Sequence, residues 1–293
     1  MIEQLDILIN SPYCIIALAS IIGLMVGSFL NVVIYRLPIM MQSNWEKECC
    51  EFLNINLFDI TKKRKSINLA LPLSHCPNCK TPIKPYQNIP LLSYFLLKGK
   101  CSKCYKPISL RYPFIELFTA IITVIVVWHF GYSPQTIFAL ILSWSLITLS
   151  CIDIDHQLLP DDITFPLLWL GIFLSLFGFF TDIHASIIGV MAGYTSLWLV
   201  YHLFKLTTGK EGMGYGDFKL FALLGGWFGW QYLTIIIIMS SLVGASIGLS
   251  LIIFAGRDYN SPIPFGPYLA ASGWLTLLWG NDLSQLYFNL LSL

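Results

Sequence analysis

The sequence predicts an all-α polytopic membrane protein with about eight transmembrane helices. Hydrophobic residues make up 56% of the 293 residues and charged residues only 11%, and the mean hydropathy is +0.71. A soluble domain carries about 25% charged residues, so this composition excludes an ordinary soluble protein. The apolar residues also form runs long enough to cross the roughly 30 Å hydrocarbon core, which takes about 20 residues of helix.

Eight apolar runs are candidates for these helices. Acidic residues, Glu3 and Asp6, precede the first run, and no small-residue cleavage site closes it. We therefore expect a retained helix and not a cleaved signal peptide. The sixth run is short, and we expect it to tilt, to dip into the membrane or to end near Trp227. The expected spans are residues 12–35, 113–130, 135–152, 163–180, 185–204, 217–230, 232–256 and 263–280.

The distribution of basic residues predicts how these helices are oriented. Thirteen of the seventeen Lys and Arg lie between Arg36 and Arg111. Because cytoplasmic loops are enriched in basic residues, we expect residues 36–112 to form a cytoplasmic insert between the first and second helices. Alternation of the eight spans then places the loops at 153–162 and 205–217 on the same cytoplasmic face.

The insert carries two pairs of cysteines with the spacing of a zinc ribbon. Cys76 and Cys79 form one C-x2-C pair, and Cys101 and Cys104 form another after twenty-one intervening residues. Four thiolates from two such turns complete a tetrahedral structural Zn²⁺ site, which stabilises a unit whose apolar core is small. The alternative is a pair of disulfides or a redox dithiol, which a reducing cytoplasm disfavours.

Two other segments of the insert have simpler interpretations. Residues 85–100 form an apolar patch of helical length that is too short to span a membrane, so we expect it to pack on the ribbon or to lie at the membrane surface. Residues 42–70, which include the basic run at 62–65, are expected to be a solvated or headgroup-facing linker.

Two acids lie where apolar runs meet the cytoplasmic loops, and acids at such positions are functional candidates. Asp153 closes the third span, and Asp217 opens the sixth, sixty-four residues later, after the glycine-rich segment 212–216. Glycines there allow a substrate or another helix to approach closely. Two carboxylates held together in a low dielectric can share one proton, so that one polarises a peptide carbonyl while the other activates water. We predict that Asp153 and Asp217 are a catalytic pair.

Other roles for these acids remain open. Asp155 and Asp161 flank Asp153 and compete with it as the partner of Asp217, while Asp161 and Asp162 are also placed to cap the fourth span. Asp217 could in the same way stabilise the start of the sixth. The acids would equally suit a proton- or ion-coupled transporter, although no repeat symmetry relates the two halves of the sequence. A non-enzymatic scaffold of a secretion machine, docking through the cysteine insert, is a further alternative.

The ordered set of motifs resembles the type IV prepilin peptidases, intramembrane aspartic proteases of bacterial pilus and type II secretion systems. The resemblance implies an endopeptidase of the bacterial inner membrane that removes the short basic leader of prepilins and pseudopilins after Gly, on the cytoplasmic face. It also implies N-methylation of the new N-terminal residue with S-adenosylmethionine. The catalytic acids of the family match Asp153 and Asp217, and its zinc cysteines match the tetrad. The segments that carry the resemblance are 27–38, 111–117, 152–161, 212–220 and 262–274, with Cys76, Cys79, Cys101 and Cys104.

The resemblance also predicts how the chain is organised. We expect a first helix at 1–35, a methyltransferase-associated insert at 36–112 and a peptidase domain at 113–293, with prepilins, pseudopilins and lipid as partners and no nucleic acid.

No G-x-G-x-x-G follows a strand, so a Rossmann-type cofactor site is not indicated. We expect Glu116, inside the second span, to pair structurally with Arg36 or Arg111. The polar candidates near the methyl-donor site are Asn31, Arg36, Asn88, Arg111 and Glu116.

Overall fold

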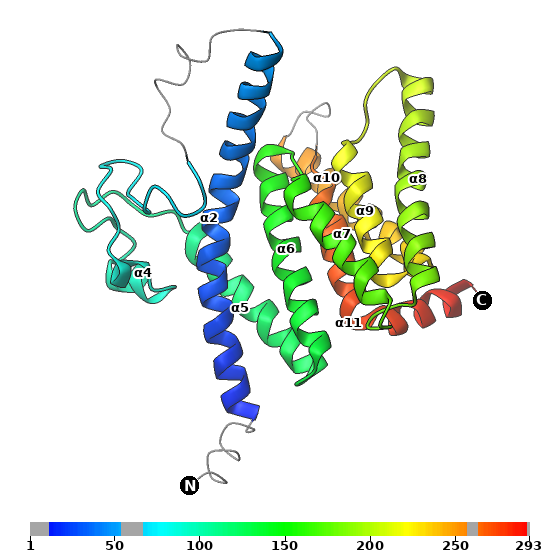
Figure 1. Cartoon of the computed structure of the whole chain (residues 1–293), viewed down its shortest axis with the longest axis horizontal. Coiled ribbons are helices and arrows are strands. Elements are labelled where there is room, and N and C mark those ends of the chain that lie inside the picture. Colours follow the sequence, from blue (N-terminus) through cyan, green and yellow to red (C-terminus); the bar gives the residue numbers. More distant parts are fainter. Residues whose placement is uncertain (1–11, 54–66, 257–262, 292–293) are drawn as a thin grey trace. The chain divides into compact units, whose positions relative to one another are not determined.

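The computed structural model describes residues 12–53, 67–256 and 263–291, so the basic run at 62–65 and Arg257 lie outside the described residues. Within these ranges the regular elements are helices, joined by turns that include two isolated β-bridges, and the predicted all-α class is confirmed. The chain divides into two compact units, Met1–Tyr132 and Ser133–Leu293 (Figure 1).

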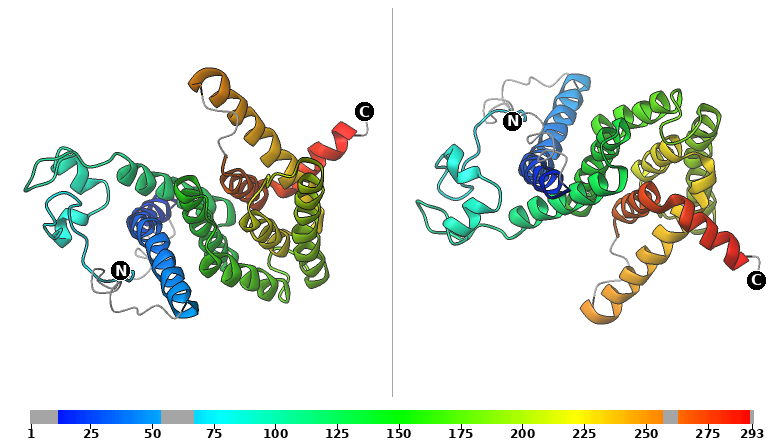
Figure 2. Two further views of the ribbon diagram at one scale, coloured as in Figure 1. Left: turned by 90° about the horizontal axis from the view of Figure 1, so that it is seen from above. Right: turned by 90° about the horizontal axis from the view of Figure 1, so that it is seen from below.

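Two long helices form the body of the first unit. They are α2, Pro12–Phe52, and α5, Arg111–Phe130, which pack side by side (Figure 2). A Cβ atom at Gly23 would lie 2.6 Å from Cα of Ala120, and one at Gly27 would lie 2.8 Å from Cα of Glu116. Small residues of this kind let two helices in a membrane approach closely, and here they set the spacing of α2 and α5.

Helix α2 is longer than the sequence indicated. The apolar run was expected to end at residue 35, but the helix continues through Pro38 to Phe52, a length of 41 residues. The residues after Pro38 include Met, Gln, Glu and Lys, which are good helix formers outside a membrane as well as inside one. The expectation of a linker is therefore wrong for residues 42–52, because the end of an apolar run does not by itself end a helix.

The segment between the cysteine pairs is also less regular than expected. In place of one helix-length patch at 85–100, it contains the 3₁₀ turn η1, Pro85–Asn88, and the short helix α4, Leu92–Leu96. Leu91 has φ 56° and Gly99 has φ 67°, so the backbone turns sharply on both sides of α4. These turns fold the segment back between its two cysteine pairs.

The second unit is a bundle of six α-helices among the described residues. Its central helix is α9, whose residues from Leu220 to Phe228 are all buried and which packs against α7, α8 and α11. The backbones of Gly189 and Gly225 are in direct contact, and the indole N–H of Trp227 donates a hydrogen bond to the carbonyl of Leu167 at 2.8 Å. The helices of this unit are α6, Pro134–His156; α7, Asp161–Ser175; α8, Ile183–Thr208; α9, Tyr215–Phe228; α10, Leu233–Ala255; and α11, Gly266–Leu291, with the 3₁₀ turn η2, Trp230–Tyr232.

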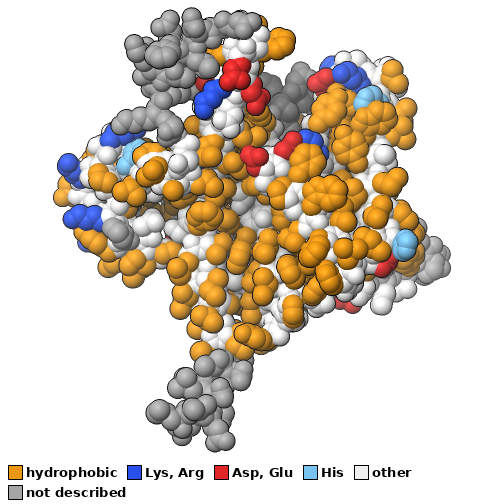
Figure 3. Space-filling model, in the orientation of Figure 1, with side chains coloured by type: hydrophobic (Ala, Val, Ile, Leu, Met, Phe, Trp, Pro, Cys, Tyr) orange, Lys and Arg blue, Asp and Glu red, His pale blue; other side chains and the backbone are white. Residues whose placement is uncertain are grey.

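Each of the eight expected spans coincides with a helix, but the number of membrane crossings is not confirmed. Five described helices, α2, α5, α6, α8 and η2–α10, are long and apolar enough to cross a membrane. Helices α7 and α9 have 15 and 14 residues. At about 1.5 Å per residue they are shorter than the hydrocarbon core. Figure 3 shows hydrophobic side chains over most of the visible helical surface, with acidic and basic side chains at the upper end of the second unit.

Candidate active site

Asp153 lies in the last turn of α6 and is buried. The helix continues past it to His156 and ends at Gln157, which has a left-handed backbone with φ 54°. The side chain of Asp153 is 5% exposed, and its Oδ2 accepts a hydrogen bond of 3.0 Å from the backbone N–H of Gly266. Gly266 begins α11, so a segment 113 residues further along the chain holds this carboxylate.

Asp217 lies in the first turn of α9 and is also buried, at 7% exposure. Its backbone N–H donates to the carbonyl of Gly214, which is the N-cap of the helix. A negative charge in this turn suits the helix dipole, so the expected stabilising role at the helix start is compatible with a role in chemistry. The buried side chain, however, does not act as the N-cap itself.

The tertiary structure brings these two acids together. The charge of Asp153 acts electrostatically on Asp217, although they lie on different helices. Leu159, in the turn between α6 and α7, lies beside the glycines next to both acids. A Cβ atom at Gly216 would lie 2.9 Å from Cβ of Leu159, and one at Gly266 would lie 3.3 Å from its Cδ1. Figure 1 shows that α6 and α8 end, and α9 begins, at one end of the second unit.

The competing acids occupy a different environment. Asp155, Asp161 and Asp162 are exposed, and Asp161 forms an ion pair of 2.7 Å with Nζ of Lys219. The expected N-cap role of Asp161 or Asp162 is wrong, because Pro160 occupies the N-cap with an extended backbone and the two acids lie in the first turn of α7. Their charges still suit the start of that helix.

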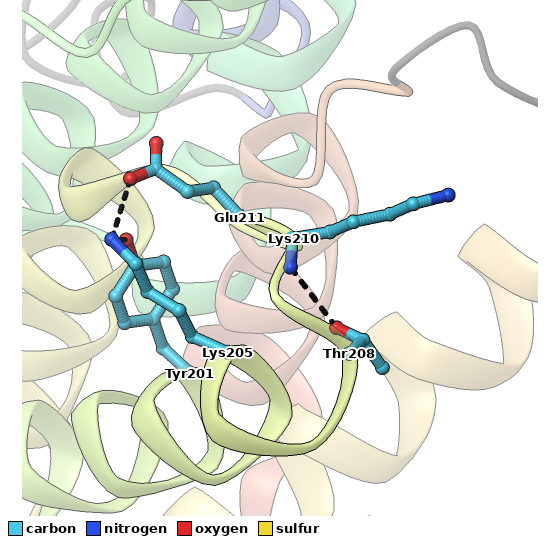
Figure 4. A network of polar contacts seen from close by, with 5 residues as sticks. All are labelled: Tyr201, Lys205, Thr208, Lys210 and Glu211. Carbon is cyan, nitrogen blue, oxygen red and sulfur yellow. Dashed lines mark hydrogen bonds and ion pairs between the residues drawn. The ribbon is translucent and has the colours of Figure 1, made fainter.

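Polar contacts fasten the loop that leads to Asp217 onto the end of α8 (Figure 4). Nζ of Lys205 pairs with Oε1 of Glu211 at 2.7 Å and donates to the hydroxyl of Tyr201 at 3.4 Å, and the backbone N–H of Lys210 donates to Oγ1 of Thr208 at 3.3 Å. The hydrogen bond from Lys205 holds the pKa of Glu211 below its ordinary value. Because this pair is exposed to solvent, it orients the loop without contributing much stability.

The sequence did not indicate that Gly266, Leu159 and the Lys205–Glu211 pair belong to this region. Gly266 lies within the motif at 262–274, to which no role was assigned, and that motif was the available signal for it. Nothing in the local pattern distinguished Leu159 from other apolar residues. Its role depends on the packing of α6, α9 and α11 around it.

The cysteine tetrad forms a second candidate site, in the first unit. The four sulfur atoms lie within 4.8 Å of one another and could hold a metal ion. The Sγ atoms of Cys76 and Cys104 are 3.8 Å apart, and those of Cys79 and Cys101 are 3.9 Å apart. Four thiolates bound to one tetrahedral Zn²⁺ at about 2.3 Å would be separated by about 3.8 Å, so these residues fit zinc. All four are free thiols in this structure, not disulfides.

Both cysteine turns have the same backbone arrangement. In each, the residue after the second cysteine, Lys80 or Tyr105, has φ near 56–58° and donates its N–H to the carbonyl of the first cysteine. The hydrogen bond between the side chains of Cys79 and Thr81 lowers the pKa of Cys79 to about 6, whereas burial and the neighbouring thiols raise the pKa of Cys104 to about 11. A metal ligand must be a thiolate, so a bound cation would displace the proton of Cys104.

The candidates for a methyl-donor site make structural contacts with the backbone. Nδ2 of Asn31 donates to the carbonyls of Gly27 and Tyr112, while the guanidinium of Arg36 donates to three carbonyls in residues 68–72. The partner of Glu116 is the backbone N–H of Leu91, at 2.8 Å, and not Arg36 or Arg111 as expected. That N–H is exposed for bonding by the sharp turn at Leu91. Backbone contacts thus hold three of the five candidates, Asn31, Arg36 and Glu116, in place.

Comparisons with known proteins cover almost the whole chain. Residues 21–130 match the bacterial peptidase A24 N-terminal domain, and residues 140–249 match the type IV leader peptidase family. The chain is 50% identical over 283 residues to the prepilin leader peptidase/N-methyltransferase of Pseudomonas aeruginosa, covering 97% of both proteins. Proteins of the same name from Legionella pneumophila and Neisseria gonorrhoeae are 44% and 46% identical, over 96–97% and 94% of the chains. No solved structure matches the chain.

Proposed function

Because the chain belongs to the type IV leader peptidase family, we propose that Asp153 and Asp217 are the catalytic carboxylates with which this enzyme removes the leader of a prepilin. The observation that carries the proposal is the pairing of two buried acids from different helices, close enough to interact electrostatically. Peptide hydrolysis needs a proton donor for the carbonyl oxygen and a proton acceptor for the attacking water. Two neighbouring carboxylates that share one proton supply both.

The position of the acids suits a substrate that is itself a membrane protein. Prepilins and pseudopilins have a basic leader followed by an apolar helix, so the helix can remain in lipid while the cleavage site reaches the membrane surface. Asp153 and Asp217 lie in the last and first turns of their helices, at an end of the unit where acidic and basic side chains gather. The excess of basic residues in 36–111 favours the cytoplasmic side of the bacterial inner membrane for that end.

The second activity proposed is N-methylation of the new N-terminal residue, with S-adenosylmethionine as the methyl donor. Its support is the name shared by the relatives, which includes an N-methyltransferase. We propose that residues 36–112 serve this activity and residues 113–293 serve cleavage. No side chain is assigned to the cofactor, and three of the five candidates, Asn31, Arg36 and Glu116, hydrogen-bond to the backbone.

For the cysteine tetrad we propose a structural Zn²⁺ bound by Cys76, Cys79, Cys101 and Cys104. The sulfur separations support it, since they equal the edges of a tetrahedral zinc–thiolate site. With four protein ligands no coordination position is left for water or substrate, so the metal would stabilise the fold and take no part in either reaction.

The test of the peptidase proposal is leader removal from a purified full-length prepilin, followed as a mobility shift, with the protein in detergent or liposomes. Asp153→Asn and Asp217→Asn keep the shape of the side chain and remove its proton chemistry, so each should slow cleavage by about 10²–10⁴-fold. Asp155→Asn is the matched control, since Asp155 is an exposed acid on the same helix. Cleavage by Asp153→Asn at the parent rate would transfer the role to Asp155 or Asp161. If the parent protein itself does not cut, the peptidase proposal fails and ion flux becomes the next measurement.

A further inference from the structure

Gly266 lies unusually close to the carboxylate of Asp153. Its backbone N–H donates a buried hydrogen bond of 3.0 Å to Oδ2. A Cβ atom on Gly266 would lie 2.6 Å from the same Oδ2 and 3.2 Å from Cγ. Side chains essentially never approach to 2.6 Å, so the carboxylate occupies the space that any other residue at 266 would fill. The Asp153 carboxylate can therefore accept this hydrogen bond in its present position because residue 266 has no side chain.

Gly214, the glycine nearest the carboxylate of the other acid, is under no such restriction. A Cβ atom at Gly214 would lie 3.7 Å from Oδ2 of Asp217, which is an ordinary contact. The backbone of Gly214 also interacts with the Asp217 carboxylate, but Gly214 is only three residues away, in the same turn. The two acids are therefore held in different ways, since only Asp153 is fixed by a donor from a distant part of the chain.

Resting on the proposed peptidase function, we propose that Gly266 is a positioning residue whose N–H orients Asp153 as the proton acceptor of the reaction. An N–H donor stabilises the charged form of a carboxylate, so it favours an ionised Asp153 in the resting site. The bond uses Oδ2. Oδ1 is therefore the oxygen of Asp153 that is left to accept a proton from water.

This orientation assigns one role to each acid. A water molecule forms a bond to the scissile carbonyl carbon and gives one proton to Oδ1 of Asp153, while the carbonyl oxygen takes the proton held by Asp217. The resulting gem-diol collapses when its carbon–nitrogen bond breaks. The amine nitrogen then takes the proton from Asp153, and a hydroxyl of the diol returns a proton to Asp217. Both carboxyl groups end in the state in which they began, and no other reactant is consumed.

Among the described residues, few titratable groups come near Asp153 from the helices packed around it. Helix α9 brings Asp217, whose interaction with Asp153 is described above. Helix α11 brings Tyr268, whose ring lies beside Gly244 of α10. In the first turn of α7, Asp161 is paired with Lys219. The pH dependence of cleavage should therefore report mainly on Asp153 and Asp217.

The test compares Gly266→Ala with the parent protein in cleavage of a purified full-length prepilin across a range of pH. Displacement of the Asp153 carboxylate by about 1 Å should lower kcat about a hundredfold with little change in KM. A carboxylate that loses its N–H donor holds its proton more tightly, so the acid limb of the pH profile should move to higher pH. Gly248→Ala on α10 is the matched control, because its new Cβ would meet only the end of the Ile263 side chain.

A second variant separates positioning from packing. Leu159→Ala with Gly266→Ala removes the contact of 3.3 Å between the new Cβ and Leu159 but leaves the clash with Asp153. Parent activity in Gly266→Ala, or restored activity in the double variant, would overturn the proposal. Movement of the alkaline limb in place of the acid limb would make Asp153 the proton donor and overturn the assignment of roles. Parent-like cleavage by Asp153→Asn would instead take the catalytic role away from Asp153, and failure of the parent protein to cut would defeat the peptidase function itself, so these failures can be told apart.

Discussion

The cysteine tetrad of the first unit and the aspartate pair of the second are assembled by opposite means. Each cysteine pair lies in one tight turn, and its two sulfurs face the other pair across a short segment of chain. The aspartates come from α6 and α9, and Gly266 of α11 completes the site from 113 residues away. A metal site with local ligands can therefore form with little surrounding core, whereas the acid site exists only if several helices are packed correctly.

Removal of the metal should have the largest effect among the tests of this difference between the two sites. Binding of Zn²⁺ by zinc-finger peptides contributes about 10–16 kcal/mol, so chelation or Cys76→Ser should unfold the segment between residues 70 and 110. Leader cleavage, which we assign to residues 113–293, should persist. Metal content and limited proteolysis of the purified protein measure the first effect, with the exposed Cys49→Ser as control. Loss of cleavage on chelation would show that the two units are not independent.

A substitution that creates a cavity in the second unit should have the opposite effect, destabilising that unit and leaving the metal site intact. Trp227 is 1% exposed, lies against Gly171 and bonds the Leu167 carbonyl, so Trp227→Ala should destabilise the second unit by about 3–5 kcal/mol. The loss of stability is measured by denaturant unfolding, with the loss of leader cleavage as the signal. The metal content should not change. Trp169→Ala, at a side chain that is 65% exposed, is the matched control and should have a much smaller effect. Equal effects of the two variants would contradict the role given to α9 packing.

A smaller effect is expected where the cysteine segment is fastened to α5. Glu116→Ala leaves the Leu91 N–H without its acceptor, which costs about 1–3 kcal/mol. Hydrogen exchange at residues 89–97 should become faster. Glu116→Gln keeps an acceptor oxygen and should largely preserve protection. If Gln behaves like Ala, the charge of Glu116 matters and not the bond alone.

The smallest effect should come from the Lys205–Glu211 pair on the loop before Asp217. Lys205→Met should change the cleavage rate by less than roughly twofold, because exposed ion pairs contribute little. The lowered pKa of Glu211 means that the pair stabilises the folded state at neutral pH and that this contribution is lost as the pH falls through the lowered value. The difference in thermal midpoint between the parent and Glu211→Gln, measured against pH, checks the sign. A difference that grew on acidification would contradict it.

Much of this protein could be predicted from patterns of short range. The apolar runs located eight helices, and the C-x2-C spacing selected the four clustered cysteines. Family membership, indicated by the ordered motifs, is confirmed by the comparisons. The errors concerned the ends of two helices and the partner of one buried acid. Helix α2 continued beyond its apolar run, Pro160 took the N-cap expected of Asp161 or Asp162, and Leu91 replaced an arginine as the partner of Glu116.

The sequence by itself determined the membrane class, the positions of the helices and the acids and thiols available for chemistry, because apolar periodicity and ligand spacing are properties of neighbouring residues. Only the tertiary structure decided which acids are buried, that Asp153 and Asp217 interact, and that Gly266 supplies the donor to Asp153. The physical reason is the packing of α6, α9 and α11. A carboxylate loses its water, and gains a backbone partner from a distant segment, only when helices far apart in sequence close around it.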